Sequence, residues 1–309
     1  MADIVAPRSG VVVGTQRNSL HKLMQRKSTI AFLMALPLIL LIGILVAYPA
    51  GYAIWLAMLN KSMTKFVGFG NFDFLMKRAT FWDIVFQSCL FAITAVIFKA
   101  IIGFVVAHFV HNIPSKGQRK WRGMLLVPWV IPPAMSTLAW LWLFDPSYSA
   151  FNWIFAHIGL PHIPWTGEAG WARFSVILVN IWAGAPFFMI MYLAALKSVP
   201  EQLYEAAAID GATWWQRIWY VTLPMMRNII AITALFSTIV TFANFDIVRV
   251  LTAGGPLTST HVFATWAFRV GIESGDIPLG ATVSLFMVPI PAVAATFILR
   301  DINKRGSEV

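Results

Sequence analysis

The chain alternates between long apolar stretches and short polar ones. A helix needs about 20 apolar residues to cross the hydrocarbon core of a membrane. A helix that faces lipid is apolar nearly all round, so length identifies such helices better than periodicity does. No ten-residue alternation typical of a membrane β-barrel is visible. The pattern predicts an all-α integral membrane protein with six transmembrane helices, at about residues 30–58, 81–110, 123–144, 173–195, 225–249 and 277–299.

These stretches divide the chain into three parts. Residues 1–29 form an N-terminal tail, residues 30–299 the six-helix domain with a polar loop at 196–224, and residues 300–309 a C-terminal tail. The first apolar stretch is much longer than the 7–15 residues of a signal-peptide core, so we expect it to stay in the membrane. In the N-terminal tail, Gln16–Ser28 mixes leucine with basic residues. This fits either an interfacial helix on the inner leaflet or a solvated tail.

Composition excludes a soluble protein. Hydrophobic residues make up 59% of the chain and charged residues 12%, with a mean hydropathy of +0.73, whereas about a quarter of the residues of soluble proteins are charged. The net charge of +10 comes from basic residues in loops beside apolar stretches, without the pattern of a nucleic-acid-binding protein. We therefore expect a lipid bilayer around the protein and no nucleic-acid partner. The single cysteine, Cys89, excludes an intrachain disulfide.

The distribution of basic residues predicts the orientation. Lysine and arginine concentrate in the cytoplasmic loops of membrane proteins, and an even number of crossings puts both termini on one side. That side carries fifteen basic residues, in the two tails, the loops at 111–122 and 196–224, and Arg227 just after the second loop. The opposite side carries six, namely Lys61, Lys65, Lys77, Arg78, Arg173 and Arg269. The cluster in 60–80 runs against the rule, but the balance predicts that both termini are cytoplasmic.

The polar loop between the fourth and fifth stretches has its own pattern. Glu205–Ala208 is strongly helix-forming, and Asp210-Gly211 supplies a turn in which glycine adopts a positive φ. Tryptophans and an isoleucine then recur at helical spacing up to Pro224. On physical grounds alone the segment fits two interpretations. It is either a rigid helix pair on which a partner docks, or an interfacial helix pair with its tryptophans at headgroup depth.

Three segments together carry a resemblance to a known family. The run EAAAIDGATWWQRIWYVTLP, residues 205–224, resembles the EAA loop of importer permeases of the ATP-binding-cassette (ABC) superfamily. Residues 66–72 resemble the F-V-G-L-x-N-F segment of its carbohydrate branch. Phe242–Asp246, with Leu251–Pro256 and Thr260, resembles the F-N-x-F-D…L-T-x-G-G-P…T pattern of that branch. The resemblance covers most of residues 30–300.

The resemblance implies a type I ABC importer permease fold and assigns roles within the loop. Glu205 is expected to pair with a basic residue of an ATPase subunit, and Gly211 to permit the turn between two coupling helices. Ile218 stands where the family usually has phenylalanine, so the apolar anchor of the loop is less bulky here. The residues assigned to coupling are Glu205, Ala206, Ala207, Asp210, Gly211, Ile218 and Pro224.

The same resemblance implies partners and a location. No Gly-x-x-x-x-Gly-Lys-Ser/Thr phosphate-binding loop occurs in the sequence, so the chain is expected not to be an enzyme itself. ATP and Mg are expected on two separate cytoplasmic ATPase subunits. The other expected partners are a second, homologous permease that forms a heterodimer with this chain, an external solute-binding protein, and a sugar substrate. The location is the cytoplasmic (inner) membrane of a prokaryote.

Polar side chains inside the apolar stretches are candidates for a substrate path. Such groups are costly in lipid and usually face a bundle interior or a water-filled cavity. Hydroxyl and amide groups suit the hydrogen bonds of a sugar, and aromatic rings suit its C–H faces. The candidates are Asn180, Trp182, Thr241, Asn244, Phe245 and Asp246. The alternative for each polar residue is a hydrogen bond between helices, worth about 0.6–2 kcal/mol.

Other polar or small residues in the second apolar stretch have simpler interpretations. Lys99 is expected to extend toward the interface or to be paired within the protein rather than to bind substrate. Gly103 and Ala107 form a small-xxx-small pair, which lets another helix approach closely, within this subunit or in a partner permease. His108 and His111 are three residues apart without a third ligand nearby, so we expect no metal site.

Alternative functions remain at this point. The same superfamily also imports other small solutes, such as glycerol-3-phosphate. An ion-driven secondary transporter would show inverted repeats and helices broken at corresponding positions, which this sequence lacks. A membrane enzyme for lipid-linked sugars would need acidic or metal-ligating clusters near the inner interface. The sequence favours a sugar or polyol importer over these classes.

Overall fold

The structure, a computed structural model, describes residues 27–306. The prediction of an interfacial helix in the tail 1–29 therefore falls almost wholly outside the described residues. The chain divides into two compact units, Met1–Tyr52 and Ala53–Val309, and each is described by itself.

The described residues of the first unit form one long helical segment, which continues past Tyr52 to Ala57. Helix α2 (Lys27–Ile42) continues through a π-helical turn, η1 (Gly43–Ala47), into α3 (Tyr48–Ala57). Most of its described side chains are apolar and exposed, Met34 to 78%, as expected of a helix that is surrounded by lipid.

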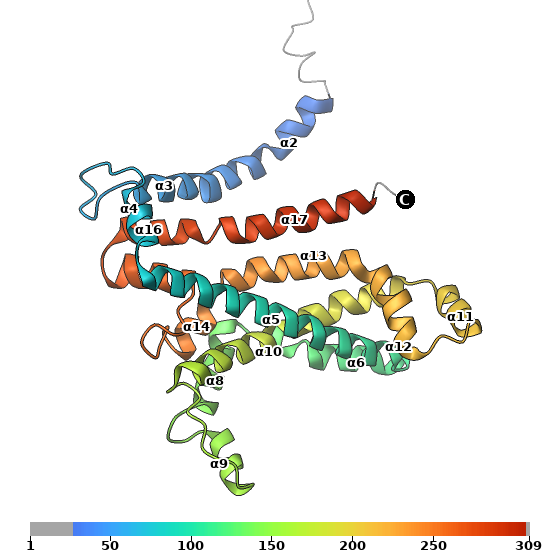
Figure 1. Ribbon diagram of the computed structural model, residues 1–309. Helices are drawn as coiled ribbons and strands as arrows, with labels where there is room; N and C mark the ends of the chain where they lie inside the picture. Colours follow the sequence, from blue (N-terminus) through green and yellow to red (C-terminus); the bar gives the residue numbers. More distant parts are fainter. Residues whose placement is uncertain (1–26, 307–309) are drawn as a thin grey trace, which may run out of the picture. The chain divides into compact units, whose positions relative to one another are not determined.

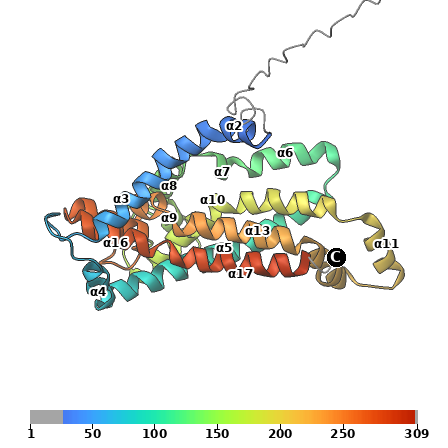
Figure 2. The same cartoon turned by 90° about the horizontal axis from the view of Figure 1, so that it is seen from above.

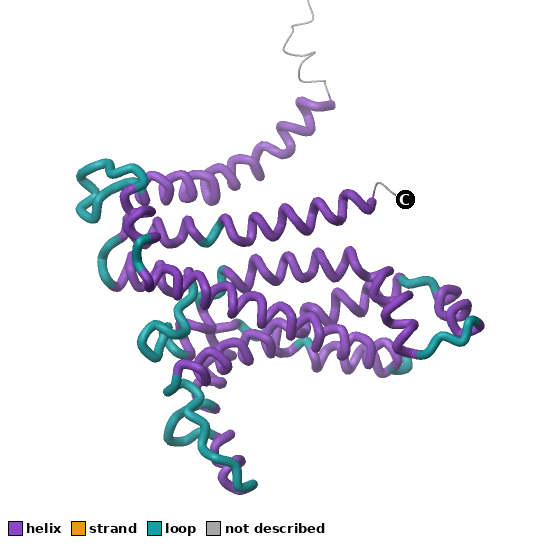
Figure 3. Tube along the Cα trace, viewed as in Figure 1, coloured by secondary structure: helices purple, strands orange, loops and turns teal. Residues whose placement is uncertain are grey.

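The second unit is helical over its described residues, apart from loops and an isolated bridge between Leu59 and Phe66. Figure 3 shows that its loops lie mainly between the ends of the helices. In chain order its elements are α4 (Gly70–Met76), α5 (Ala79–Asn112), α6 (Ser115–Leu125), α7 (Val127–Val130), α8 (Pro133–Leu143), α9 (Ala150–His157), α10 (Ala169–Ser198), α11 (Glu201–Ile209), α12 (Trp214–Arg217), the π-helical η2 (Ile218–Thr222), α13 (Leu223–Phe242), α14 (Asp246–Leu251), α15 (Phe263–Phe268), the π-helical η3 (Arg269–Glu273), α16 (Ile277–Phe286) and α17 (Pro289–Gly306).

The core of this unit lies between its long helices. Helices α5 and α10 pack against each other, α13 lies against both, and α17 lies against α13, as Figures 1 and 2 show. A glycine permits the close approach of the first two, because a Cβ built at Gly103 would lie 2.3 Å from the Cβ of Phe188. Ala107, one turn along, is fully buried. The small-residue pair therefore packs within this subunit.

Prolines determine where two of the long helices end. Ile113 precedes Pro114 and Val199 precedes Pro200, and both are extended, because the proline ring disfavours a helical conformation in the residue before it. In Figures 1 and 2, α6 and α11 lie toward one end of the second unit. Helices α4, α14 and α16 lie at the other end. The basic loops at 111–122 and 196–224 thus share one end, as the predicted topology requires.

The third predicted crossing, 123–144, is formed by short helices on either side of a break instead of by one continuous helix, so the predicted count of six long helices is approximate. Helix α7 ends at Val130, Ile131 and Pro132 are extended, and α8 begins at Pro133. The apolar run hides a break, since proline lacks a backbone donor and disfavours helix before it. Five helices of the described chain, not six, are long and apolar enough to cross a membrane: Ile30–Ala57, Ala79–Asn112, Ala169–Ser198, Trp214–Phe242 and Ile277–Ile302.

The fifth crossing ends earlier than predicted. Helix α13 stops at Phe242 instead of continuing to 249, and the chain restarts as α14 at Asp246. The backbone N–H of Asn244 donates to Thr241 O (3.1 Å), three residues back, and this contact tightens and ends the last turn of the helix. The apolar residues after Asp246 therefore belong to a separate short helix.

Candidate functional site

The polar loop folds as a helix, a turn and a second helix, as predicted. Helix α11 ends at Ile209, the chain turns at Asp210 and Gly211, and α12 begins at Trp214. Gly211 has a φ of +74°, and a Cβ built there would meet nothing within 4 Å. The backbone conformation, rather than lack of space, therefore favours glycine at this turn.

Polar contacts within the loop fix its second half and join it to α11. Thr213 and Gln216 form a capping box, in which the Thr213 amide donates to Gln216 Oε1 (2.7 Å), and this starts α12. The hydroxyls of Tyr204 in α11 and Thr222 in η2 lie 3.0 Å apart. Ile218 is 4% exposed, so the residue that replaces the usual phenylalanine still anchors the loop in the core.

The opposite face of the loop is exposed. Ile209 is 87% exposed, although it is apolar, and Ala207 is half-buried. The other predicted coupling residues that lie on the surface are Glu205, Ala206, Asp210, Gly211 and Pro224. The fold thus presents a thin helix with the carboxylates of Glu201 and Glu205 to its surroundings, and the role of the predicted residues in coupling stays a prediction.

A partly open cavity with several polar lining residues lies between α5, α7, α10 and α13 of the second unit. Its volume is about 160 Å³. It brings together three of the six predicted path residues, Asn180, Thr241 and Asn244. The aromatic rings that line it are Trp129, Phe187 and Phe236.

The other three predicted path residues lie outside this cavity. Trp182 lines a separate apolar cavity and packs against Trp140, with ring centroids 5.5 Å apart. Phe245 packs against Phe268 at 5.2 Å. Asp246 is exposed at the first residue of α14.

Lys99 also lines the cavity, and the sequence analysis did not predict it there. Its side chain is buried, and Nζ donates to Thr241 Oγ1 (3.0 Å). Lys99 is therefore paired within the protein, one of the two alternatives, and it does not reach the interface. Its place in an otherwise apolar helix was the available signal.

Two amide oxygens in the cavity wall have no partner. Asn180 Oδ1 and Asn244 Oδ1 are buried, and neither accepts a hydrogen bond from another described group. Buried polar atoms are nearly always hydrogen-bonded. These atoms can therefore accept hydrogen bonds from a molecule in the cavity.

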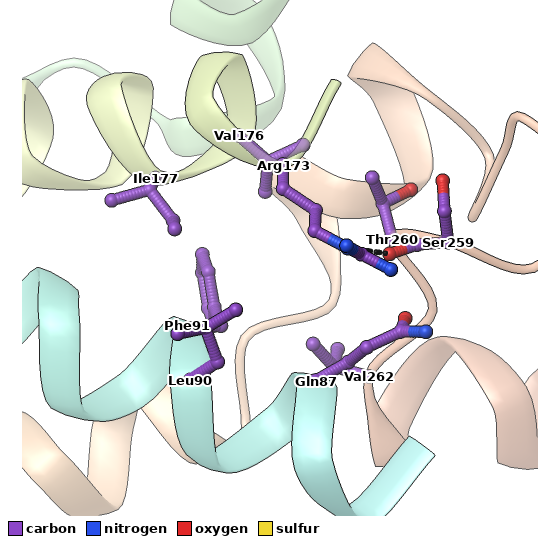
Figure 4. Close-up of a pocket in the computed structure, with 9 residues that line it drawn as sticks. All are labelled: Gln87, Leu90, Phe91, Arg173, Val176, Ile177, Ser259, Thr260 and Val262. Atoms are coloured by element: carbon purple, nitrogen blue, oxygen red, sulfur yellow. Dashed lines mark hydrogen bonds between the residues drawn. The ribbon is translucent and has the colours of Figure 1, made fainter. Parts of the chain in front are cut away.

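A second, small cavity lies toward the end of the unit opposite α11. Its volume is about 20 Å³, room for about one water molecule. Figure 4 shows Arg173 of α10 extending toward the loop that contains Ser259, while Gln87 approaches from α5. The Arg173 Nε donates to Ser259 O (2.9 Å). The loop is thus fixed to the long helices by a charged side chain.

The structure of the same loop shows why a glycine is needed in its L-T-A-G-G-P segment, residues 251–256. Gly254 has a φ of +87°, and a Cβ there would lie 2.1 Å from the His261 ring, so only glycine fits. His261 is 1% exposed, and its ring nitrogens lie 3.1 Å from Thr265 Oγ1 and 3.0 Å from Arg269 Nη1. Burial, and then the charge of Arg269, lower the pKa of His261 to about 4. The imidazole is therefore neutral at neutral pH.

The helix bundle, the partly polar cavity and the exposed loop fit a membrane transport protein. Comparison with known proteins gives the family. Residues 99–306 match the family described as "Binding-protein-dependent transport system inner membrane component". The chain belongs to this family, which confirms the resemblance to importer permeases and the inner-membrane location.

Several characterised relatives cover nearly the whole chain. The trehalose/maltose transport system permease protein of Thermococcus litoralis is 31% identical over 273 residues, 87% of this chain and 92% of the relative. The sulfoquinovosyl glycerol transport system permease protein of Agrobacterium fabrum is 28% identical, over 89% and 91% of the two chains. The sn-glycerol-3-phosphate transport system permease protein of Pectobacterium atrosepticum is 27% identical, over 90% and 97%.

A solved structure confirms the fold. A chain of a bacterial ABC transporter involved in the import of the acidic polysaccharide alginate superposes with a TM-score of 0.80. The match covers 92% of this chain and 98% of that one, at 24% sequence identity. The all-α permease fold predicted from the sequence is therefore correct, although the count of six crossings is approximate.

Proposed function

We propose that this chain is the permease subunit of an ATP-driven importer of sugars or related polyols. It forms half of the translocation path, and its loop at 196–224 docks on an ATPase subunit. The proposal rests mainly on the position of α11. This helix exposes Glu205, and its Tyr204 contacts Thr222, which directly precedes α13. Helix α13 lines the polar cavity, so a movement of α11 reaches the cavity wall.

The energy source lies in other subunits of the proposed assembly. Two ATPase subunits bind ATP and Mg on the cytoplasmic side, and this chain contributes no phosphate-binding loop of its own. Glu205 pairs with a basic residue of the ATPase, and closure of the ATPase dimer moves α11. The two tails lie on the same cytoplasmic side, which the distribution of basic residues supports.

A second permease completes the path. Ligand pockets typically measure about 300–1,000 Å³, whereas the cavity in this chain measures about 160 Å³. A half-site of this size supports pairing with a homologous subunit in a heterodimer. An external solute-binding protein delivers the cargo. One matched structure, 25% identical with a TM-score of 0.77, is of a bacterial alginate ABC transporter in complex with an alginate pentasaccharide-bound periplasmic protein.

The cargo is a sugar or a sugar-derived polyol. The relatives named above are permeases for trehalose and maltose, sulfoquinovosyl glycerol, and glycerol-3-phosphate. The cavity of this chain combines amide and hydroxyl groups with aromatic rings. This combination suits a polyhydroxylated molecule, whose hydroxyls need hydrogen bonds and whose C–H faces pack on rings.

Glu205→Arg tests the proposal. A reversed charge at a docking interface costs about 2–5 kcal/mol, which is more than tenfold in affinity. We expect the variant to reach the membrane but to lose both co-purification of the ATPase and ATP-dependent sugar uptake. Glu201→Arg is the matched control, because it makes the same charge change on the same exposed helix outside the motif.

Two outcomes would contradict the proposal. One is normal assembly and uptake by the Glu205→Arg protein. The other is uptake that survives depletion of ATP but stops when the ion gradient collapses, which would indicate a secondary transporter.

A further inference from the structure

Lys99 lies deep inside the membrane-spanning part of α5. At a rise of 1.5 Å per residue, it is about 30 Å from the first residue of the helix and about 20 Å from the last. These distances exceed the reach of a lysine side chain, and the side chain is 4% exposed. Ionisable groups at such depth are costly and usually mark the path of a substrate or an ion.

The ammonium group lacks a counter-ion in this chain. Its hydrogen-bond acceptor is Thr241 Oγ1 at 3.0 Å, a neutral hydroxyl. No Asp or Glu lines the cavity, and Lys99 forms no ion pair among residues 27–306. A buried charge without a paired carboxylate is costly. An anion in the cavity would supply the missing charge.

The neighbouring helix leaves room for this side chain. A Cβ built at Gly184 of α10 would lie 2.6 Å from Lys99 Cε and 3.0 Å from its Nζ. Any side chain at position 184 would therefore displace the ammonium group. The glycine keeps the charged end of Lys99 against the cavity wall between α10 and α13.

The rest of the wall complements a molecule with many hydroxyls. Asn180 Oδ1 and Asn244 Oδ1 are buried without partners, so both can accept from hydroxyl groups. Trp129 stacks on Phe187 with ring centroids 5.9 Å apart, and Phe187 contacts Phe236 at 5.3 Å. One wall is therefore aromatic, while the amides and the ammonium group make the rest polar.

We propose that this cavity is an anion subsite, in which Lys99 binds the carboxylate, sulfonate or phosphate group of an acidic sugar or polyol. Asn180 and Asn244 accept hydrogen bonds from the hydroxyls of the same molecule. The inference rests on the proposed function and narrows its cargo to an anionic class. A charge-assisted hydrogen bond is worth about 1.5–3 kcal/mol, or about 10–100-fold in affinity.

The test compares ligands that differ in charge. The assembled importer, in nanodiscs without the external binding protein, is titrated with cellobiose against cellobiouronic acid, glycerol against glycerol 3-phosphate, and glucosyl glycerol against its 6-deoxy-6-sulfonate. We expect the wild-type importer to bind the anionic member of at least one pair tenfold or more tightly, about the value of one charge-assisted bond. Lys99→Met should abolish that preference and leave binding of the neutral member unchanged. Lys61→Met, at an exposed lysine outside the cavity, is the control.

A second variant protects the test against misfolding of the first. Gly184→Ala keeps Lys99 but moves its ammonium group, so it should lower binding of the anion more than that of its neutral counterpart. Equal losses for both members in both variants would show a structural role for Lys99 and overturn the inference. So would equal binding of both members by the wild type, although sugar import would then stand. If no member of any pair is bound or imported with ATP, the proposed function fails, and the inference fails with it.

Discussion

At the scale of single residues, one buried histidine, His261, fills the interior of the loop between α14 and α15. His261 fills the space that Gly254 leaves, and it contacts Thr265 and Arg269. Arg269 lies on the segment that also carries Glu273, whose carboxylate pairs with Arg249 at 2.7 Å. A proton on His261 would add a second positive charge beside the Arg269 guanidinium. The neutral ring is therefore a condition for this packing.

This arrangement predicts loss of stability in acid. The pKa of His261 is about 4 in the folded protein, against 6.5 ordinarily, so the unfolded chain binds the extra proton first as the pH falls. The stabilisation is complete above about pH 6.5 and is lost progressively toward pH 4. The midpoint temperature of thermal unfolding in detergent should decrease as the pH is lowered from 6.5 to 4. In His261→Gln this temperature should depend less on pH. His157→Gln, at an exposed histidine, should leave that dependence unchanged; an identical pH profile for wild type and His261→Gln would contradict the assignment.

At the scale of elements, the helices themselves were predictable and their interruptions were not. Apolar length alone locates five long helices, because lipid requires it. The break at Pro132 lies inside a continuous apolar run, and the end of α13 at Phe242 lies inside a predicted crossing that also contains Asn244 and Asp246. Hydropathy carries no information about these breaks, and proline and turn chemistry decide them. The prolines were visible in the sequence, whereas the turn at Asn244 depends on a backbone contact.

The residues that line the cavity were also only partly predictable from the sequence. Asn180 was identifiable because an amide in an apolar helix must face something polar. Trp182 follows it by two residues, which is about 200° around a helix, so the two cannot line one wall. Lys99 is the opposite case, since α5 is apolar on all sides and its sequence does not indicate which face is internal. Only the packing of α10 against it, through Gly184, shows where the lysine points.

The contact between α11 and η2 carries a prediction of its own. Tyr204→Phe removes the hydrogen bond to Thr222, worth about 1 kcal/mol, while the ring keeps its packing. If this contact transmits the movement of α11, the variant should assemble normally but hydrolyse more ATP per molecule imported, by up to about fivefold. Tyr220→Phe is the control, since Tyr220 is 79% exposed in the same segment. An unchanged ratio of ATP to cargo in Tyr204→Phe would mean that the coupling movement takes another route.

At the scale of the whole molecule, the second unit has two different ends. One end holds α11 and the basic helix α6, and the other holds α9 and α14 (Figure 1). The long helices cross between them, so each end should face one side of the membrane. The proposed function requires α11 on the ATPase side and the other end toward the external binding protein.

Labelling with a membrane-impermeant maleimide tests this orientation directly. Cys89 is the single cysteine of the chain, so Cys89→Ala gives a cysteine-free background with one substitution. In that background Tyr148→Cys replaces a residue that is 90% exposed beyond α8, and Lys116→Cys replaces an exposed residue of α6. We expect the cysteine at 148 to react in spheroplasts and the cysteine at 116 only after permeabilisation. The reverse pattern would place α11 outside, where no ATPase can reach it, and coupling through Glu205 would then be impossible.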